Sequence, residues 1–162
     1  MARNTQRLSI IVDTQEIAHG HPWRFPATRA STSVSNLIPR GVDYTVRGYA
    51  GIIGVERKSH GDYIRCIGKD WRRFQKQLEK LEKHTYACVI VEGHIDDYII
   101  YSNFGHDFVV YRTAQIVSRG IPVIFCGNKD LSAKCCWDFF QHSIRRLQNA
   151  NSETEDQLDE GT

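Results

Sequence analysis

Several features that mark particular classes of protein are missing from this chain of 162 residues. Its longest apolar runs, Tyr86–Val91 and Ile121–Cys126, are much shorter than the roughly 20 apolar residues of a membrane-spanning helix. The basic N-terminus has no apolar stretch before a cleavage site, so we expect no secretory signal. The chain also contains no internal repeat and no glycine-rich phosphate loop. The sequence therefore predicts one globular domain with no membrane partner.

The five cysteines form no Cys-x-x-Cys pair, and their number is odd. Cys88 and Cys126 lie within apolar runs, where a free cysteine behaves as a small hydrophobic residue. This usage favours a reducing compartment and argues against a structural zinc site. A cysteine nucleophile would need a partnered histidine, and only Cys66 has the surroundings expected of an exposed thiol. His19 and His21 form a metal-like pair but lack a third ligand at a diagnostic spacing.

Basic residues are absent from positions 151–162, which carry the acids Glu153, Glu155, Asp156, Asp159 and Glu160. Without these five acids, 21 basic residues stand against 14 acidic ones, so the rest of the chain has a net charge of +7. A basic body suggests a polyanionic partner, although many solvated surfaces are equally basic. We therefore expect a domain over residues 1–150 and an acidic, disordered tail over residues 151–162.

Strand and helix signals alternate along the domain, which predicts an α/β fold with a mixed sheet and helices on both faces. Strands are expected at Leu8–Asp13, Tyr86–Val91, Ile121–Cys126 and, more weakly, Tyr98–Tyr101. Helices are expected at His60–Gly68, Trp71–Leu81, Phe108–Ser118 and Asp130–Asn149, with a short one near Ser33–Leu37. In the last helix the expected buried residues are Leu131, Trp137, Phe140, Ile144 and Leu147.

Residues 41–58 predict a β-hairpin with its turn at Gly48-Tyr49-Ala50-Gly51. A turn centred between Tyr49 and Ala50 pairs residues whose numbers sum to 99, so Asp43 lies opposite Glu56. Directly opposed side chains have Cβ atoms about 4.5–5.5 Å apart, so two carboxylates there repel unless a cation lies between them. Lys58 projects to the same face as Glu56 because side chains alternate along a strand. The hairpin therefore predicts a site of two acids and a lysine.

The helix expected at Trp71–Leu81, which Asp70 can cap, has one apolar stripe and one basic stripe. The basic stripe consists of Lys69, Arg72, Arg73, Lys76, Lys80 and Lys83. Spacing alone leaves two interpretations open, a merely solvated helix face and a surface that binds phosphates. For the second interpretation the DNA-binding candidates are Arg72, Arg73, Lys76 and Lys80.

A series of short elements along the chain resembles one known family. These elements are Asp13, Gly41-x-Asp43-Tyr44, Val55-Glu56-Arg57-Lys58, Asp62, Arg73-Phe74-x-x-Gln77-Leu78 and Val91-Glu92-Gly93. They are similar to the nuclease domain of the XPF family, over about Leu8 to Gly93 and more loosely beyond residue 121. Members of that family are structure-specific endonucleases that cut branched DNA. The resemblance implies a restriction-endonuclease-like fold of the PD-(D/E)xK superfamily.

The chain departs from the family pattern in three ways. Gln15 stands where the family commonly has arginine in Asp-x-Arg-Glu, which leaves open whether Arg24 or Arg29 substitutes. One residue, Val42, is inserted in the family's Gly-Asp-Tyr element. The tandem helix-hairpin-helix domain of many members is missing, so we expect a stand-alone nuclease domain of a phage, a bacterium or an archaeon, acting in the cytoplasm or at the nucleoid. A homodimer through the last helix remains conceivable.

The resemblance, together with the chemistry of phosphodiester hydrolysis, assigns roles to individual residues. Asp43 and Glu56 are the expected ligands of Mg²⁺ or Mn²⁺, with the backbone carbonyl of Arg57 as a third. Lys58 would orient or deprotonate the attacking water. Asp13 would bind a second ion or hold Lys58.

Two further members of the expected catalytic set have more than one interpretation. Arg57 lies on the opposite strand face and would pair with Asp62 or brace the following helix. Asp62 serves either the chemistry or the cap of a helix. The expected partner is DNA that is branched or has a junction of single and double strands. Two other functions stay open: a non-catalytic DNA-binding or scaffold subunit, and a restriction- or resolvase-like nuclease.

Overall fold

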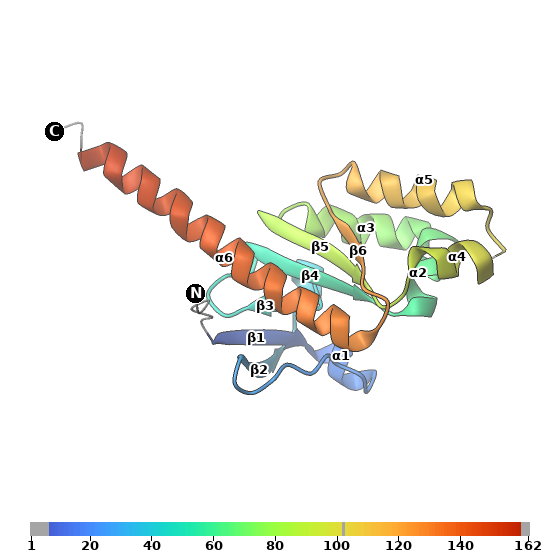
Figure 1. Ribbon diagram of the computed structural model, residues 1–162, viewed down its shortest axis with the longest axis horizontal. Coiled ribbons are helices and arrows are strands. Elements are labelled where there is room, and N and C mark those ends of the chain that lie inside the picture. Colours follow the sequence, from blue (N-terminus) through green and yellow to red (C-terminus); the bar gives the residue numbers. More distant parts are fainter. Residues whose placement is uncertain (1–6, 102, 160–162) are drawn as a thin grey trace.

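The computed structural model describes residues 7–101 and 103–159. Within these residues the strands form one six-stranded sheet in the order β2-β1-β3-β4-β5-β6 (Figure 1). The strands are β1 (Leu8–Asp13), β2 (Ala30–Ser35), β3 (Tyr44–Val46), β4 (Ile53–Lys58), β5 (Tyr86–Val91) and β6 (Val123–Phe125). Of these described strands, only β3 runs antiparallel to its neighbours. The predicted mixed α/β sheet is confirmed.

Helices cover both faces of the sheet, as predicted (Figure 1). They are α1 (Thr14–Ala18), the 3-10 helix η1 (Ile38–Arg40), α2 (His60–Ile67), α3 (Trp71–Leu81), α4 (Ile95–Tyr101), α5 (His106–Val117) and α6 (Lys129–Asp159). The long helix α6 packs on one face, where Cys136 and Phe140 contribute fully buried side chains. Residues of α2, α3, α4 and α5 form a second core on the other face.

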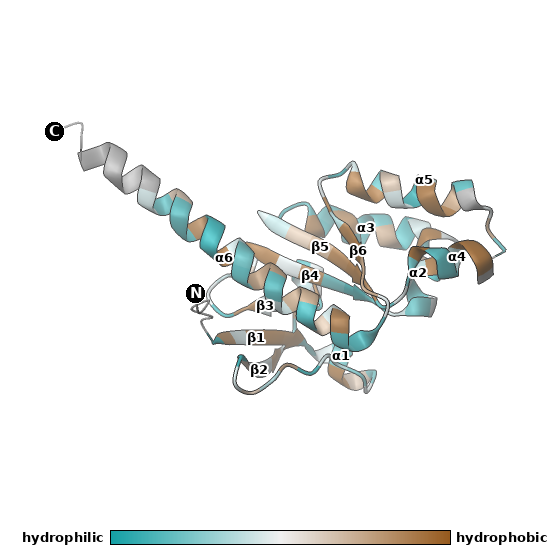
Figure 2. Ribbon diagram, in the orientation of Figure 1, coloured by the Kyte–Doolittle hydropathy of each residue, from teal (hydrophilic) through white to brown (hydrophobic). Residues whose placement is uncertain are grey.

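The sequence of strand β5 is apolar at every position because both of its faces are buried. Cys88 and Ile90 face the core under α6, whereas Val89 and Val91 face the core under α2 and α3. Both faces of the strand are therefore buried, which is typical of a strand with parallel neighbours on both sides. Figure 2 shows the resulting hydrophobic strip in the middle of the sheet.

Two expected elements differ from the structure. Residues Ala30–Ser35 form the edge strand β2, paired in parallel with β1, instead of a helix near Ser33–Leu37. Pairing with β1 overrides the weak helical signal of this Ser/Thr-rich segment. Residues Ile95–Tyr101 form the helix α4 instead of a strand at Tyr98–Tyr101. Asp96 and Asp97 lie in its first turn, where acids stabilise a helix, and Asp97 accepts a hydrogen bond from the backbone N–H of His94.

Helix ends also differ from the predictions. Asp70 precedes α3 but forms no capping hydrogen bond; its carboxylate pairs with Arg65 and Arg73 instead. Leu131 is exposed, because it lies in the first turn of α6 and faces away from the sheet. The helix α6 continues through residues 151–159, where we expected disorder, since extending an existing helix needs no new nucleation. The division into a domain and a separate tail stays a prediction.

No helix in the described part of the chain is both long and apolar enough to cross a membrane.

Candidate active site

The topology brings several acids to one end of the sheet. Asp13 ends β1, Lys58 ends β4 and Glu92 follows β5. Asp43 directly precedes β3, which runs in the opposite direction, so it reaches the same end. These side chains are far apart in sequence and meet because parallel strands finish at one edge of a sheet.

The predicted hairpin register is confirmed. Tyr44 pairs with Val55, so the register continues to Asp43 and Glu56. The turn between the strands relies on Gly48 and Gly51, whose φ angles of 86° and 85° suit residues without a Cβ atom. The backbone N–H of Asp43 donates to Val55 O at 3.0 Å, and the carboxylate Oδ2 of Asp43 accepts from the backbone N–H of Arg57 at 2.7 Å. These bonds fix Asp43 beside Glu56.

Glu56 and Lys58 form a buried ion pair on the face of β4 that is turned toward α3. Glu56 is 1% exposed, and its Oε1 accepts a hydrogen bond from Lys58 Nζ at 2.5 Å. Its second oxygen, Oε2, is buried and has no hydrogen-bond partner within the described residues. The amine of Lys58 also lies over the ring of Phe74 on α3, with Nζ 5.1 Å from the ring centre. One carboxylate oxygen is thus held in place and the other is left without a donor.

Burial shifts the pKa values of both acids upward, and the neighbouring Glu56 raises that of Asp43 further. The pKa of Asp43 lies well above its ordinary value because of burial and the neighbouring Glu56, and Lys58 only partly offsets this. Burial also raises the pKa of Glu56 against the attraction of Lys58. For Lys58, burial lowers the pKa, but the carboxylates of Glu56 and Asp43 raise it by more. The ion pair with Glu56 therefore favours the charged form of Lys58 in the cation-free site.

A hard divalent cation fits this donor set. Two adjacent carboxylates with raised pKa values and an unpartnered buried oxygen are stabilised by a positive ion bound through oxygen. The described residues contain no cluster of three or more His, Cys, Asp or Glu side chains arranged to hold a metal. The fit therefore rests on the carboxylates of Asp43 and Glu56, and the remaining ligands would be backbone carbonyls or waters. Mg²⁺ suits such a site because it usually keeps several waters.

Asp13 is fully engaged with backbone groups. Its Oδ1 accepts from the N–H of Gln15 at 2.8 Å and so caps α1, and its Oδ2 accepts from the N–H of Leu37 at 2.6 Å. Lys58 pairs with Glu56 and not with Asp13, so the expectation that Asp13 holds Lys58 is not met. Asp13 still lines the same cavity as Asp43 and Glu56.

Arg57 points to the other face of β4, as alternation predicts, but its partners are not those expected. Its guanidinium forms ion pairs with Glu16 and Glu92, each at 2.7 Å. The indole Nε1 of Trp23 also donates to Glu92, at 2.5 Å, and the Tyr44 hydroxyl donates to Glu16 at 3.1 Å. The predicted pairing of Arg57 with Asp62 is therefore wrong, because Asp62 lies on α2, which packs on the other face of the sheet.

Asp62 belongs to the cap of α2. Ser59 accepts the backbone N–H of Asp62 and donates its hydroxyl to Asp62 Oδ2 at 2.6 Å, a reciprocal capping arrangement. The other oxygen of Asp62 pairs with Arg65 at 2.5 Å. Asp62 also lines the cavity, so the capping role is observed and a catalytic one stays a prediction.

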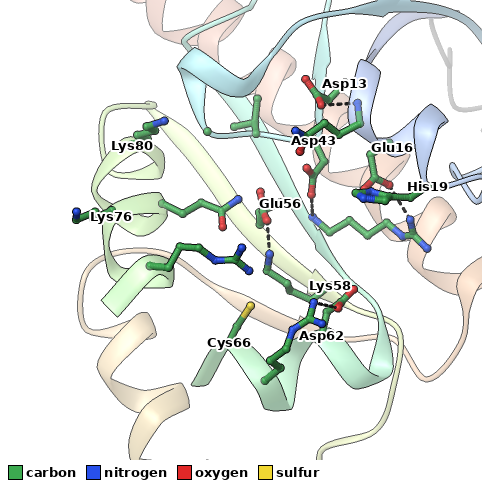
Figure 3. A pocket seen from close by; sticks show the side chains of 17 residues that line it. Asp13, Glu16, His19, Asp43, Glu56, Lys58, Asp62, Cys66, Lys76 and Lys80 are labelled. Atoms are coloured by element: carbon green, nitrogen blue, oxygen red, sulfur yellow. Dashed lines mark hydrogen bonds and ion pairs between the residues drawn. The ribbon is translucent and has the colours of Figure 1, made fainter. Parts of the chain in front are cut away.

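The acids face the basic side of α3 across a cavity of about 590 Å³. Arg73, Lys76 and Lys80 line this cavity together with Gln77, at spacings of three and four residues that place them on one helix face. Figure 3 shows Lys76 and Lys80 on one side, Asp13, Asp43 and Glu16 on the other, and Glu56 and Lys58 between them. Arg72, the fourth expected DNA-binding residue, is exposed but is not among the cavity residues.

Several site residues were missed or misjudged from the sequence. Glu16 and Trp23 belong to the network around Arg57 and were not predicted. The only sequence signal for them was the position of Glu16 in the segment Asp13-Thr14-Gln15-Glu16. Arg29 does not replace the guanidinium missing at Gln15, because it lies over the ring of Trp137 on the α6 face. Cys66 lines the cavity but is only 4% exposed, and burial raises the pKa of its thiol. The exposed thiol expected from the sequence is therefore wrong.

Comparison with known proteins identifies the fold. No family model and no curated protein matches this chain. The solved structures that match include XPF from Aeropyrum pernix in complex with DNA, and XPF from Aeropyrum pernix. The first has a TM-score of 0.67 and 21% identity over 86% of this chain and 66% of that one. The second has a TM-score of 0.62 and 19% identity over 83% and 61%.

This chain thus spans less than two thirds of the length of each of these two proteins. At these identities the comparison shows the fold alone. The chain has the fold of these XPF structures, as the resemblance in its sequence predicted.

Proposed function

We propose that this protein is a metal-dependent DNA endonuclease that hydrolyses phosphodiester bonds in branched, flap or fork DNA. The observation that carries the proposal is the pair of acids, half-buried Asp43 and buried Glu56, beside Lys58 at the base of a cavity with a basic wall. A protein that only needed the fold would be more stable with an uncharged pair there, because burying adjacent carboxylates is costly.

Each part of the cavity has a place in this chemistry. Asp43 and Glu56 would hold Mg²⁺ or Mn²⁺, which supplies a polarised phosphate oxygen and an activated water when bound. Lys58 would orient or deprotonate the attacking water, or donate a hydrogen bond to a phosphate oxygen, where it stabilises developing negative charge.

The opposite wall of the cavity supports binding of the DNA backbone. Arg73, Lys76 and Lys80 present their charges at one face of α3 toward the acids. Contacts of this kind position a duplex through its phosphates and do not read its sequence. The DNA complex of the matched XPF structure agrees with this kind of partner. We further propose that the preference for branched DNA follows the family resemblance.

Cleavage assays with flap, fork and linear DNA test the proposal directly. The wild-type protein, Asp43→Asn and Glu56→Gln are incubated with Mg²⁺ or Mn²⁺, with Asp138→Asn as a matched control on the α6 face. We expect cutting by the wild type and the control, and a loss of about 10²–10³-fold in the two site variants. If neither metal supports cutting above the level of Asp43→Asn, the protein is not a nuclease, and a non-catalytic DNA-binding subunit explains the fold better.

DNA affinity in EDTA separates binding from cleavage. Lys76→Gln and Lys80→Gln should weaken duplex binding and lower the slope of log K against log salt by about 0.9 for each phosphate that the variant no longer neutralises. Lys134→Gln, on the α6 face, is the control. Unchanged slopes in the α3 variants would contradict a DNA-binding role of this helix face.

A further inference from the structure

A group of aromatic side chains lies where α3 meets α5, beyond the basic wall of the cavity. The guanidinium of Arg112 on α5 lies over the ring of Trp71 on α3, 4.4 Å from its centre. The same guanidinium is 5.3 Å from the centre of the Phe108 ring and 5.9 Å from that of Tyr111. Phe108 in turn stacks with Phe104 at 4.5 Å, with an angle of 23° between the rings.

Two rings of this group are exposed to solvent, whereas Trp71, Phe108 and Arg112 are half-buried. Tyr111 is 58% exposed and Phe104 is 36% exposed. Large exposed aromatic side chains that hold a fixed position in a soluble protein indicate a binding surface. Arg112 restrains the rings: its Nη1 donates to Gln115 Oε1 at 2.9 Å, while its Nε has no hydrogen-bond partner in the described part of the chain.

The aromatic group is surrounded by positive charge. Lys69 and Arg72 are exposed at the start of α3, next to Trp71, and Arg112 lies within the group. The nearby acid Asp70 is already paired with Arg65 and Arg73. Asp107 remains as an exposed acid on α5. The charge therefore favours an anionic partner with flat faces.

The aromatic group and the cavity lie on different sides of α3, with Arg72 between them. Successive residues of an α-helix are rotated by 100°, so Trp71, Arg72 and Arg73 follow one another around α3. Arg73 lines the cavity, Arg72 faces solvent and Trp71 contacts Arg112. A DNA strand leaving the cavity would pass around α3 over Arg72 to reach the aromatic group.

We propose that this aromatic surface binds single-stranded DNA beside the catalytic cavity, with bases stacking on Tyr111 and Phe104 and phosphates contacting Lys69, Arg72 and Arg112. Base stacking on aromatic side chains within a basic surface is the general mode of sequence-independent single-strand binding. The inference rests on the proposed nuclease function and adds where the single-stranded arm of a branched substrate lies.

A second copy of this chain is the competing occupant of the surface. In a twofold dimer the same patch lies on both subunits, so Lys69, Arg72 and Arg112 would approach their own copies. Like charges facing each other oppose such an interface, whereas they attract a DNA strand. Charge therefore favours DNA, and the experiment includes the dimer as an outcome.

The test measures binding of a fluorescent 15-nucleotide oligothymidylate and of a duplex of equal length in EDTA, by anisotropy. Tyr111→Ala and Phe104→Ala should each raise the Kd for the single strand by about tenfold and leave the Kd for the duplex unchanged. Tyr111→Phe keeps the ring and should restore binding. The matched control is Val110→Ala, whose side chain is 51% exposed on the same helix and should have no effect.

Two outcomes would overturn the inference. Single-strand binding that is unchanged in both alanine variants excludes the surface as a binding site. A shift from dimer to monomer in Tyr111→Ala and Phe104→Ala, measured by analytical ultracentrifugation without a change in DNA binding, shows that a second copy occupies it. Because binding is measured without metal, a failure to cleave any DNA counts only against the proposed nuclease function.

Discussion

The charged residues on the two faces of β4 differ in how fully they are paired. On one face, Glu56 and Lys58 are buried beside Asp43, and one carboxylate oxygen has no hydrogen-bond donor in the described residues. On the other face, Arg57 is satisfied by Glu16 and Glu92, which in turn accept from Tyr44 and Trp23. Glu56 and Lys58 therefore belong to a site with an unpartnered oxygen, whereas Arg57, between them in sequence, belongs to a network in which its charge is paired.

This difference distinguishes a candidate functional site from a structural ion network. A buried ionic network in which every partner is present holds its elements together, here α1, β4 and the end of β5. A cluster of acids with raised pKa values stores unfavourable energy that a bound cation relieves, which is typical of functional sites. We expect substitutions on the Glu56 and Lys58 face to lower activity as well as stability, and substitution of Arg57 to act mainly through stability.

The largest effect is expected from Lys58→Met. Loss of the protonated amine removes the group that stabilises charge near the phosphate, so cleavage should slow by about 10²–10⁴-fold. Single-turnover rates at saturating DNA would measure this. Lys134→Met removes a lysine from an exposed pair with Asp138 and is the control, with a rate near that of the wild type. A Lys58→Met rate close to that of the wild type would place the chemistry elsewhere.

Arg57→Met should act mainly on stability. It leaves Glu16 and Glu92 buried without their cation, which costs about 3–5 kcal/mol in the free energy of unfolding. Urea unfolding followed by circular dichroism would measure it. The exposed Arg47, changed to Met, should alter stability by less than about 0.5 kcal/mol. If Arg57→Met has the same free energy of unfolding as the Arg47 variant, the ionic network does not hold α1, β4 and the end of β5 together.

The acidic pair should give the metal-free protein a characteristic pH dependence. Because the pKa of Asp43 is raised in the folded state, its contribution to stability is fully present below the ordinary value of 3.8 and is lost as pH rises through the raised value. In EDTA, Asp43→Asn should therefore gain in Tm relative to the wild type as pH increases above 3.8. Mg²⁺ should raise the Tm of the wild type and not that of the variant. Parallel Tm curves in EDTA would show that Asp43 carries its charge without penalty.

The smallest effect concerns the helix that follows the site. Ser59→Ala removes the cap of α2 and should lower the free energy of unfolding by about 1 kcal/mol, with little change in the cleavage rate per folded molecule. Thermal unfolding and the same cleavage assay would measure both quantities. A large fall in cleavage with unchanged stability would mean that the cap positions Asp62 for the reaction.

The hairpin shows what local sequence determined. Two glycines set the turn, the turn set the register, and the register placed Asp43 beside Glu56 with Lys58 on the same face. The apolar stripe of α3 likewise predicted its buried side, Phe74, Leu78 and Leu81. These features depend on neighbours within a few residues, where periodicity and turn chemistry carry the information.

The partners of Arg57 and the edge strand β2 were decided by tertiary structure. Arg57 pairs with residues 41 and 35 positions away, and no spacing rule connects them. Residues 30–35 have the composition of a loop and become a strand only because β1 offers an edge for pairing. Sequence by itself determined which residues could perform the chemistry. Only the assembled sheet decided which ion-pair and hydrogen-bond partners these residues have. Those contacts form when strands that are distant in sequence meet at one edge of the sheet.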